Sequence, residues 1–314
     1  MEKYDLVVIG GGPAGVTAAL RASELGARVA LVERDRPGGT CTDDGCAPTR
    51  VLAKAARLIR DTEQFPDYGL SGGRPTLHLP ALLAATQRTV YELHEKKQLA
   101  GHLVGAGVTL IDGRGAAAFD DPSTVALPDG TRIRAERFVI ACGGHARRLP
   151  FPGSELALTH SNVWSLNALP RSLAIIGAAA TGAQLASIFA AFGSRVTLLE
   201  VAPRVVPGED AEISAALLAG FEANGIDVIL GIEGVDQITA AGAGRRLGYR
   251  LGGEPVQLPV DAVVLAVSVG FAWHKVMENA PVPPATSRRR CQATVPKCRE
   301  SRLPGRGNRH VGPR

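Results

Sequence analysis

The sequence predicts an α/β fold built on two copies of one strand–turn–helix–strand unit. An internal repeat, a glycine pattern and a terminal acid support this prediction. Residues 7–33 read VVIGGGPAGVTAALRASELGARVALVE, and residues 174–200 read AIIGAAATGAQLASIFAAFGSRVTLLE. The segments align without a gap, nine of their 27 positions are identical, and each ends in glutamate, at Glu33 or Glu200. This pattern is typical of a Rossmann-like, three-layer domain that is present twice.

The first copy carries the glycine spacing that a bound dinucleotide requires. Gly10, Gly12 and Gly15 form G-x-G-x-x-G directly after the strand. Gly10 permits the tight turn, Gly12 lets a pyrophosphate approach the backbone, and Gly15 lets helix and strand pack closely. The helix start offers free N–H groups to the phosphates, and Glu33 is spaced to accept hydrogen bonds from a ribose. We therefore predict a dinucleotide site; the alternative is a turn whose glycines serve packing alone.

The second copy is less regular. Gly177 and Gly182 are kept, but Ala179 replaces the middle glycine. Its methyl group points to the place where a pyrophosphate would lie. Close approach of the phosphates is therefore expected to be hindered at this site.

Two dinucleotide sites imply two dinucleotides, and the natural pair is a flavin and the nicotinamide that feeds it hydride. Glu200 favours an unphosphorylated ribose, because a carboxylate repels a 2′-phosphate. This favours NADH over NADPH. Arg195 and Arg204 lie nearby in the sequence and keep NADPH open.

Composition and charge exclude several classes of protein. No apolar run reaches the roughly 18 residues of a membrane span. The N-terminal apolar stretch follows the acids Glu2 and Asp5 and is rich in glycine, unlike a secretion signal, so we expect a cytoplasmic protein. The net charge of +5 is uneven, since residues 270–314 hold ten Lys/Arg and two Asp/Glu. Residues 1–269 are therefore acidic overall.

Two cysteines lie five positions apart in GGTCTDDGCAPTR (38–50), at Cys41 and Cys46. In a regular helix their Cα atoms would be about 8.6 Å apart, whereas a disulfide needs less than about 7 Å. A bridge therefore requires a distorted turn, and Gly45 is a residue that permits one. In a cytosolic protein such a pair is more often catalytic or metal-bound than structural.

Three interpretations of the pair remain: a redox couple, inert thiols or a metal site. Zinc would need a second Cys/His pair, which the patterned part of the chain lacks. Arg50 would supply positive charge to stabilise a thiolate, which favours the redox couple. The adjacent Asp43 and Asp44 are interpreted as a solvated turn.

The remaining pattern places helices and strands around these motifs. Helices are expected over 48–61, from about 80 to 101, and over 207–225, with HEKK (94–97) on a solvated face. Residues 66–76 read as a loop. Strands are expected within 108–119, 124–144, 226–231 and 261–267, with Pro128–Gly130 as a hairpin turn. The seven histidines are scattered and are expected at the surface.

These motifs together carry a family resemblance. GGGPAG, Glu33, the C-x4-C element with its following P-T-R, VIACGG, the second nucleotide motif and GED resemble the pyridine nucleotide–disulfide oxidoreductases. That family includes dihydrolipoamide dehydrogenase and mercuric reductase, and the likeness covers residues 1 to about 268. It implies an FAD-binding domain over 1–150 and an NAD(P)-binding domain over 151–269.

The resemblance also implies roles for individual residues. NAD(P)H would pass hydride to FAD, and electrons would reduce a Cys41–Cys46 disulfide, with Cys46 against the flavin and Cys41 exchanging with a disulfide or dithiol substrate. In lipoamide dehydrogenases the net flow is reversed. Arg50 stands where the family commonly has a lysine near the flavin, and Cys142 replaces a usual threonine. The implied FAD residues are Gly10, Gly12, Gly15, Glu33, Thr40, Arg50, Gly115 and Ala141 to Gly143. The implied NAD(P)H residues are Gly177 to Gly182 and Glu200.

The family pattern stops near residue 268. Residues 270–314 are rich in Pro and Arg and show no periodicity. We expect a truncated or frameshifted end, in which the family's dimerisation domain and His-Glu acid–base pair are missing and Cys291 and Cys298 are incidental. The alternatives are a genuine basic tail that touches nucleic acid or membrane, and a non-catalytic nucleotide-binding remnant. A mercuric-reductase-like activity is a further alternative.

Overall fold

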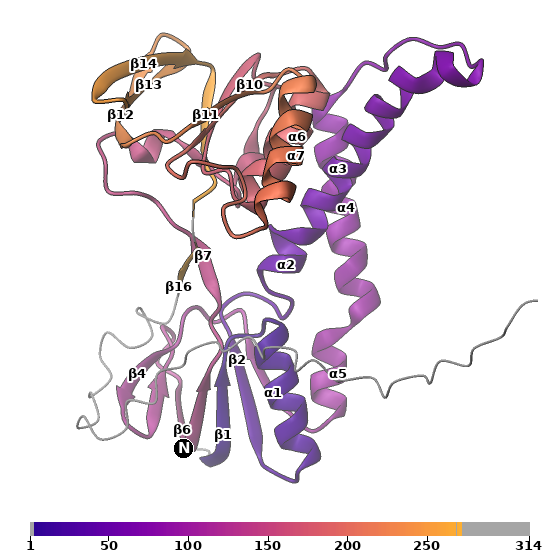
Figure 1. Cartoon of the computed structure of the whole chain (residues 1–314). Coiled ribbons are helices and arrows are strands. Elements are labelled where there is room, and N and C mark those ends of the chain that lie inside the picture. The colour runs from indigo at the N-terminus through magenta and orange to yellow at the C-terminus, as the bar shows by residue number, and fades with distance from the viewer. Residues whose placement is uncertain (1–2, 268, 272–314) are drawn as a thin grey trace, which may run out of the picture. The chain divides into compact units, whose positions relative to one another are not determined.

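The computed structural model describes residues 3–267 and 269–271, and all of them belong to one compact unit (Figure 1). These residues form parallel sheets with connecting helices, so the predicted α/β class is confirmed. Most of the basic tail expected over 270–314 lies outside the described residues. The division of the compact unit at residue 150 into two cofactor domains stays a prediction.

The first copy of the repeat forms the centre of a six-stranded sheet. Across the sheet the order is β3 (Thr109–Asp112), β2 (Val29–Glu33), β1 (Lys3–Ile9), β6 (Arg132–Ile140), β5 (Thr124–Ala126) and β4 (Ala118–Asp121). The first four strands pair in parallel, and the last two are antiparallel additions. The carboxyl ends of the parallel strands therefore meet at one edge, which is where α/β sheets bind their ligands.

Strand β1 is apolar along most of its length because both of its faces are covered. Val7 belongs to a core cluster with Phe119 and Val125 of the antiparallel strands. Val8, on the opposite face, packs with Val16 of helix α1 (Pro13–Glu24). A central parallel strand buried on both faces reads as a continuous apolar run rather than an alternating one.

The predicted hairpin turn is confirmed between β5 and β6. Leu127 N–H donates to Thr131 O at 2.9 Å, and Gly130 N–H donates to Leu127 O at 3.0 Å. Gly130 has a φ of +85°, which glycine adopts without strain. The turn therefore needs glycine at this position.

The second copy forms a five-stranded sheet in which the strands of the repeat follow the same order as in the first sheet. The strands are β11 (Asp227–Leu230), β10 (Arg195–Glu200), β9 (Ser172–Ile176), β15 (Ala262–Leu265) and β8 (Leu158–Thr159). Every pairing is parallel. The strands expected within 226–231 and 261–267 are confirmed, and the helix expected over 207–225 is α7 (Ala211–Ala223).

Two further sheets had no counterpart in the sequence prediction. A three-stranded antiparallel sheet contains β12 (Gly234–Ala241), β13 (Gly244–Leu251) and β14 (Glu254–Val260). A two-stranded sheet pairs β7 (Gly144–Ala146) with β16 (Val269–Phe271). In the three-stranded sheet, Leu247 and Ile238 are buried in a cluster with Leu265 of β15. It therefore extends the core of the second copy.

The long helix expected from about 80 to 101 is two helices. Helix α4 (Leu79–Lys97) ends at Gln98, which has a φ of +44°, and α5 (Leu99–Gly105) follows directly. The left-handed conformation is uncommon for a residue other than glycine. The single-helix prediction was wrong here because the helical spacing of apolar residues continues through Gln98. One backbone torsion at that residue changes the direction of the chain, and the spacing does not reveal it.

Helix α3 (Cys46–Asp61) is shared between the two copies of the repeat. Leu52, Ala56 and Ile59 lie in one buried cluster with Ile188 and Phe192 of helix α6 (Ala180–Phe192). The Arg60 guanidinium also donates to the Ser187 carbonyl at 3.1 Å. The helix that begins at Cys46 is therefore held from the side by the second copy.

Candidate functional site

The two glycine turns have the same hydrogen bonds at equivalent positions. Gly11 N–H donates to Glu33 Oε2 at 2.5 Å, and Asp35 N–H donates to Glu33 Oε1 at 3.0 Å. In the second copy Ala178 N–H donates to Glu200 Oε2 at 2.6 Å, and Ala202 N–H donates to Glu200 Oε1 at 3.0 Å. Each glutamate thus fixes its own turn. Glu33 is half-buried, whereas Glu200 is only 7% exposed.

Close backbone contact requires glycine at the first and third motif positions. A Cβ atom at Gly15 would lie 1.8 Å from Gly10 O, and one at Gly182 would lie 1.8 Å from Gly177 O. Gly10 and Gly177 have φ values of +108° and +101°. No other residue type fits these four places without moving the helix away from the strand.

The middle motif position is different, because its backbone suits any residue. Gly12 caps α1 with φ −72° and ψ 178°, and Ala179 caps α6 with φ −73° and ψ −177°. A Cβ atom at Gly12 would meet no protein atom within 4 Å. The space beside Gly12 is therefore open, and in the second copy the methyl group of Ala179 stands at the equivalent place.

Other residues predicted for the flavin surround the first turn. Ala141 O lies 2.4 Å from the Cβ position of Gly10, and the Gly12 Cα lies 2.9 Å from the Cβ position of Gly39, next to Thr40. Gly115 N–H donates to Arg34 O at 3.4 Å, just past Glu33. Two residues after Ala141, Gly143 has a φ of +65°. Gly177, Gly182 and Glu200 form the separate, equivalent cluster in the second copy.

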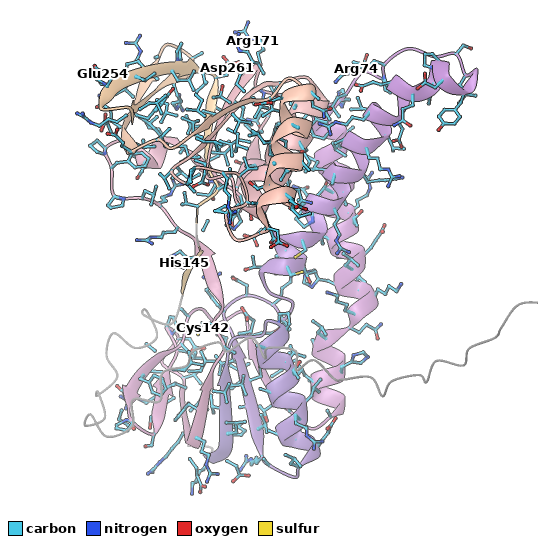
Figure 2. The ribbon with its side chains drawn as sticks, viewed as in Figure 1. Arg74, Cys142, His145, Arg171, Glu254 and Asp261 are labelled. Atoms are coloured by element: carbon cyan, nitrogen blue, oxygen red, sulfur yellow. The ribbon has the colours of Figure 1, made fainter. Side chains whose placement is uncertain are left out.

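Cys142 follows strand β6 beside the first turn (Figure 2). Its thiol donates to Ile9 O at 3.6 Å, and the side chain packs on the sheet core. Burial raises the pKa of the Cys142 thiol, and the nearby Glu33 carboxylate acts in the same direction. Cys142 is therefore held as a neutral thiol, a small packed side chain rather than a reactive one.

The cysteine pair lies on a broken helix. Cys41 is in the short helix α2 (Thr40–Asp43), and Cys46 is the first residue of α3. Between them the chain turns at Gly45, where a Cβ atom would lie 2.8 Å from Thr40 O and 3.4 Å from Cys41 Cα. The distorted turn predicted at Gly45 is confirmed. Both cysteines are exposed free thiols, and they lie close enough for the Cys46 thiol to influence the pKa of Cys41.

The contact between the two thiols raises the pKa of Cys41. The largest cause is the side-chain hydrogen bond with Cys46, followed by desolvation and by the charge of Cys46. The Cys46 backbone N–H and the positive charge of Lys97 act in the opposite direction but are weaker. The sequence predicted a thiolate stabilised by the positive charge of Arg50, and the family resemblance assigns that thiolate to Cys46. The raised pKa of Cys41 does not test this prediction, which stays a prediction.

Removing that neighbour should make Cys41 more reactive. In Cys46→Ala the hydrogen bond and the charge that raise the Cys41 pKa are both lost, so the pKa should fall and a larger fraction should be thiolate at pH 8. The measurement is the rate of iodoacetamide alkylation of Cys41 against pH, in chains whose other cysteines are serine. The midpoint should lie at lower pH in the alanine variant. A midpoint that stays or rises would contradict the thiol–thiol contact.

Helix α4 holds the segment between the cysteines. His94 Nε2 and Asp43 Oδ1 are 2.7 Å apart, and Lys97 Nζ donates to Thr42 Oγ1 at 2.9 Å. The His94 side chain is only 11% exposed and lies against Gly38, whose Cβ position is 2.5 Å from the imidazole. The prediction that HEKK (94–97) is a solvated face was therefore wrong for His94, whereas Glu95, Lys96 and Lys97 are exposed as predicted.

The solvated-turn prediction at Asp43 and Asp44 was also wrong for the Asp43 carboxylate. Asp43 accepts from Arg36 at 3.2 Å as well as contacting His94. The Asp44 carbonyl accepts from the indole N–H of Trp164 at 3.2 Å. Trp164 lies in a short helix, η3 (Val163–Ser165), that precedes β9. No local sequence signal could reveal these contacts, because each joins segments far apart in the chain.

A cavity of about 590 Å³ opens beside the two thiols, between α2, α3 and α4. Arg50, predicted near the flavin, lines it together with both cysteines. The complete lining is Cys41, Thr42, Cys46, Ala47, Arg50, Val51, Lys54, Thr89, Leu93 and Lys97. Substrate-sized molecules therefore have direct access to the sulfur atoms.

The described part of the chain lacks two other kinds of functional feature. Across residues 3–267 and 269–271, no three His, Cys, Asp or Glu side chains are grouped so that they could hold a metal ion. Within the same part of the chain, no helix combines the length and apolar character needed to cross a bilayer.

Known proteins similar to this chain agree with the geometry. The family pattern described as "Pyridine nucleotide-disulphide oxidoreductase" matches residues 4–282, somewhat past the limit near 268 expected from the motifs. The dihydrolipoyl dehydrogenase of Thermus scotoductus is 35% identical over 276 residues, covering 85% of this chain and 57% of its own. That of Zymomonas mobilis is 33% identical, covering 73% and 49%. The mercuric reductase of Lysinibacillus sphaericus is 29% identical, covering 84% and 48%.

A solved structure of a flavoprotein disulfide reductase is also similar in fold and sequence. The Cu(II) complex of the HOCl-induced flavoprotein disulfide reductase RclA from Escherichia coli matches with a TM-score of 0.74 and 30% identity. The match covers 89% of this chain and 60% of that one. This chain spans about half the length of the curated relatives it matches. The chain belongs to the pyridine nucleotide-disulphide oxidoreductases, whose cofactors are FAD and NAD(P)H.

Proposed function

We propose that this chain carries the electron path of an FAD-dependent NAD(P)H–disulfide oxidoreductase, of the dihydrolipoamide dehydrogenase type. FAD would bind at the first glycine turn, NAD(P)H at the second, and the Cys41–Cys46 pair would exchange with a disulfide or dithiol substrate. The observation that carries the proposal is the thiol pair at the start of α3, because α3 packs directly on helix α6 of the second nucleotide unit. A thiol pair and two dinucleotide turns in one compact unit suit the transfer of electrons between a nicotinamide, a flavin and the thiols.

The first turn fits the pyrophosphate of FAD. The space beside Gly12 is open and the N-terminus of α1 faces it, so free N–H groups and the helix dipole favour a phosphate there. Glu33 keeps lone pairs for a ribose while its two backbone contacts fix its position. Thr40, Gly115, Ala141, Gly143 and Arg50 would complete the site. When bound, FAD supplies two-electron chemistry between a nicotinamide and a thiol pair.

The second turn suits NADH better than NADPH. Glu200 stands at the end of β10, where its carboxylate would repel a 2′-phosphate. Its burial makes it a weaker ribose partner than Glu33, and Ala179 narrows the approach to the backbone. These differences favour a nicotinamide that binds and leaves over one that is held permanently.

The two thiols have different surroundings that suit different roles. Cys46 is the first residue of the 16-residue helix α3, which packs on the second copy of the repeat. Cys41 is exposed on the short helix α2 and lines the cavity. We therefore propose Cys46 as the thiol that faces the flavin and Cys41 as the thiol that exchanges with the substrate.

The substrate and the assembly are proposals from the relatives. Relatives named dihydrolipoyl dehydrogenase suggest a lipoyl or other small disulfide, and one named mercuric reductase keeps a mercuric substrate as the alternative. A homodimer is expected from the family, with an interface domain beyond the matched region. We propose a cytoplasmic location and no nucleic-acid partner.

The visible spectrum of the purified chain reconstituted with FAD tests the proposal. We expect stoichiometric flavin absorbance, reduction by NADH, and a long-wavelength band on partial reduction that is absent from Cys46→Ser. A chain that binds no FAD would instead be a nucleotide-binding remnant, which its half-length match to its relatives makes the second candidate. A band that persists in Cys46→Ser would remove Cys46 from its proposed role.

A further inference from the structure

The cavity beside the thiols has a strongly one-sided charge. Its charged lining residues are Arg50, Lys54 and Lys97, and no aspartate or glutamate lines it. Elsewhere residues 1–269 carry more acidic than basic side chains. The cavity is therefore positively charged, although the net charge of residues 1–269 is negative.

These three cations lack ionic partners in the described part of the chain. None of them forms a salt bridge there, and the Lys97 ammonium donates only to the neutral Thr42 hydroxyl. By contrast, neighbouring basic residues outside the cavity are neutralised: Arg36 pairs with Asp43, and Arg57 pairs with Asp61. Unpaired cations gathered in a concave site attract and concentrate anions.

The remaining lining suits the hydrocarbon part of a small molecule. Ala47, Val51 and Leu93 add apolar surface to the lining. Lys54 lies about two helical turns beyond Cys46 on α3, and Lys97 is the last residue of α4. A substrate could place a sulfur at Cys41 and a charged group at the lysines.

We propose that the disulfide substrate of the Cys41–Cys46 pair is anionic, with a carboxylate or a similar group that Lys54 and Lys97 bind. This inference rests on the proposed function and sharpens its substrate class. It separates a small acidic disulfide from a neutral lipoyl amide, for which two unpaired lysines would offer no advantage. Arg50 is not assigned to this anion site, because it is proposed to complete the flavin site.

The exchange conserves atoms and electrons. The Cys41 thiolate attacks one substrate sulfur, the substrate S–S bond breaks, and the first thiolate leaves with the electron pair. Cys46 thiolate then attacks the Cys41 sulfur of the mixed disulfide and expels the second thiolate. Two electrons pass from the dithiol to the substrate, a Cys41–Cys46 disulfide forms, and the two thiol protons go to solvent or to the leaving thiolates.

The test compares an anionic and a neutral disulfide on the reduced chain, with Cys142, Cys291 and Cys298 changed to serine. The probes are 5,5′-dithiobis(2-nitrobenzoate), which carries two carboxylates, and the neutral 4,4′-dithiodipyridine. In Lys54→Gln/Lys97→Gln the rate with the anionic probe should fall about tenfold or more, the effect of about 1.4 kcal/mol. The neutral probe should change by less than about twofold, and added salt should imitate the variant.

A matched variant controls for net charge. Arg88 and Lys96 are exposed on α4, form no ion pair among the described residues and do not line the cavity. Arg88→Gln/Lys96→Gln removes the same charge and should leave both rates nearly unchanged. If it slows the anionic probe as much as the cavity variant does, or if the cavity variant slows both probes equally, the anionic site is overturned.

The product left on the chain separates this inference from the proposed function. A redox pair consumes one probe per chain and loses two hydrogens without keeping a probe adduct, whereas two independent thiols would each keep half a probe; the mass of the reacted chain distinguishes them. If the Cys41–Cys46 disulfide forms without any preference that depends on Lys54 and Lys97, only the anionic site fails. If the chain keeps probe adducts and no Cys41–Cys46 disulfide forms, the redox pair itself fails and this inference falls with it.

Discussion

Replacing Gly15 by alanine should disrupt the first nucleotide turn and destabilise the chain by about 3 kcal/mol or more. The new Cβ would lie 1.8 Å from Gly10 O and 3.0 Å from Gly10 C, closer than nonbonded atoms can come. Both are backbone atoms, so no rotamer change relieves the contact. Helix α1 would have to move off the sheet, separating Val16 from Val8 and opening the core. Urea unfolding of the full chain, followed by circular dichroism, measures the loss.

Gly12→Ala is the matched control in the same motif. Its backbone conformation suits alanine, and no protein atom lies within 4 Å of the new methyl group. Ala179 shows that the equivalent turn forms with this side chain. Unfolding should therefore change by less than about 0.5 kcal/mol, while FAD affinity falls because the methyl group occupies the space proposed for the pyrophosphate. Equal stability of the Gly15 and Gly12 variants would contradict the close contact.

Replacing Gly45 by alanine should uncouple the two cysteines. The Cβ would lie 2.8 Å from Thr40 O and 3.3 Å from Thr40 C, so the turn that folds Cys41 back onto the start of α3 could not close as it does. A disulfide tolerates little change in the separation of its Cα atoms. We expect the equilibrium constant for forming the Cys41–Cys46 disulfide to fall about tenfold or more, or about 1.4 kcal/mol.

The measurement is the fraction of oxidised pair after equilibration in glutathione redox buffers, read by alkylation and mass spectrometry. Gly101→Ala is the control, because Gly101 is exposed in helix α5 and nothing lies within 4 Å of its Cβ position. It should leave the redox equilibrium unchanged and stabilise the chain by up to about 1 kcal/mol through helix propensity. An unchanged equilibrium in Gly45→Ala would show that the tight turn is not needed for the bridge.

The nucleotide turns could be predicted from sequence because their constraints are local. Gly10 and Gly15 lie five residues apart, and the requirement for glycine follows from one turn between a strand and a helix. Because the two copies align without a gap, the same geometry is expected in the second copy. Glu200 indeed repeats both backbone contacts of Glu33. The distorted turn at Gly45 was predictable for the same reason, since helix geometry alone rules out a bridge over that spacing.

The surroundings of the thiols could not be predicted, because they depend on how distant segments pack. His94 and Asp43 are 51 residues apart, and Trp164 and Asp44 are 120 apart. HEKK has the composition of a solvated helix end, and only the packing of α4 against α2 turns His94 inward. The raised pKa of Cys41 depends in the same way on the fold, because the turn at Gly45 brings the Cys46 thiol beside it.

Helix α3 makes the two nucleotide units inseparable, although they are repeats. A chain cut near residue 150 would keep both cysteines and the whole first turn. It would also leave Leu52, Ala56 and Ile59 without the apolar surface of α6 that now covers them. The two similar units therefore share a buried cluster, and the cysteine pair lies at the start of the helix that joins them.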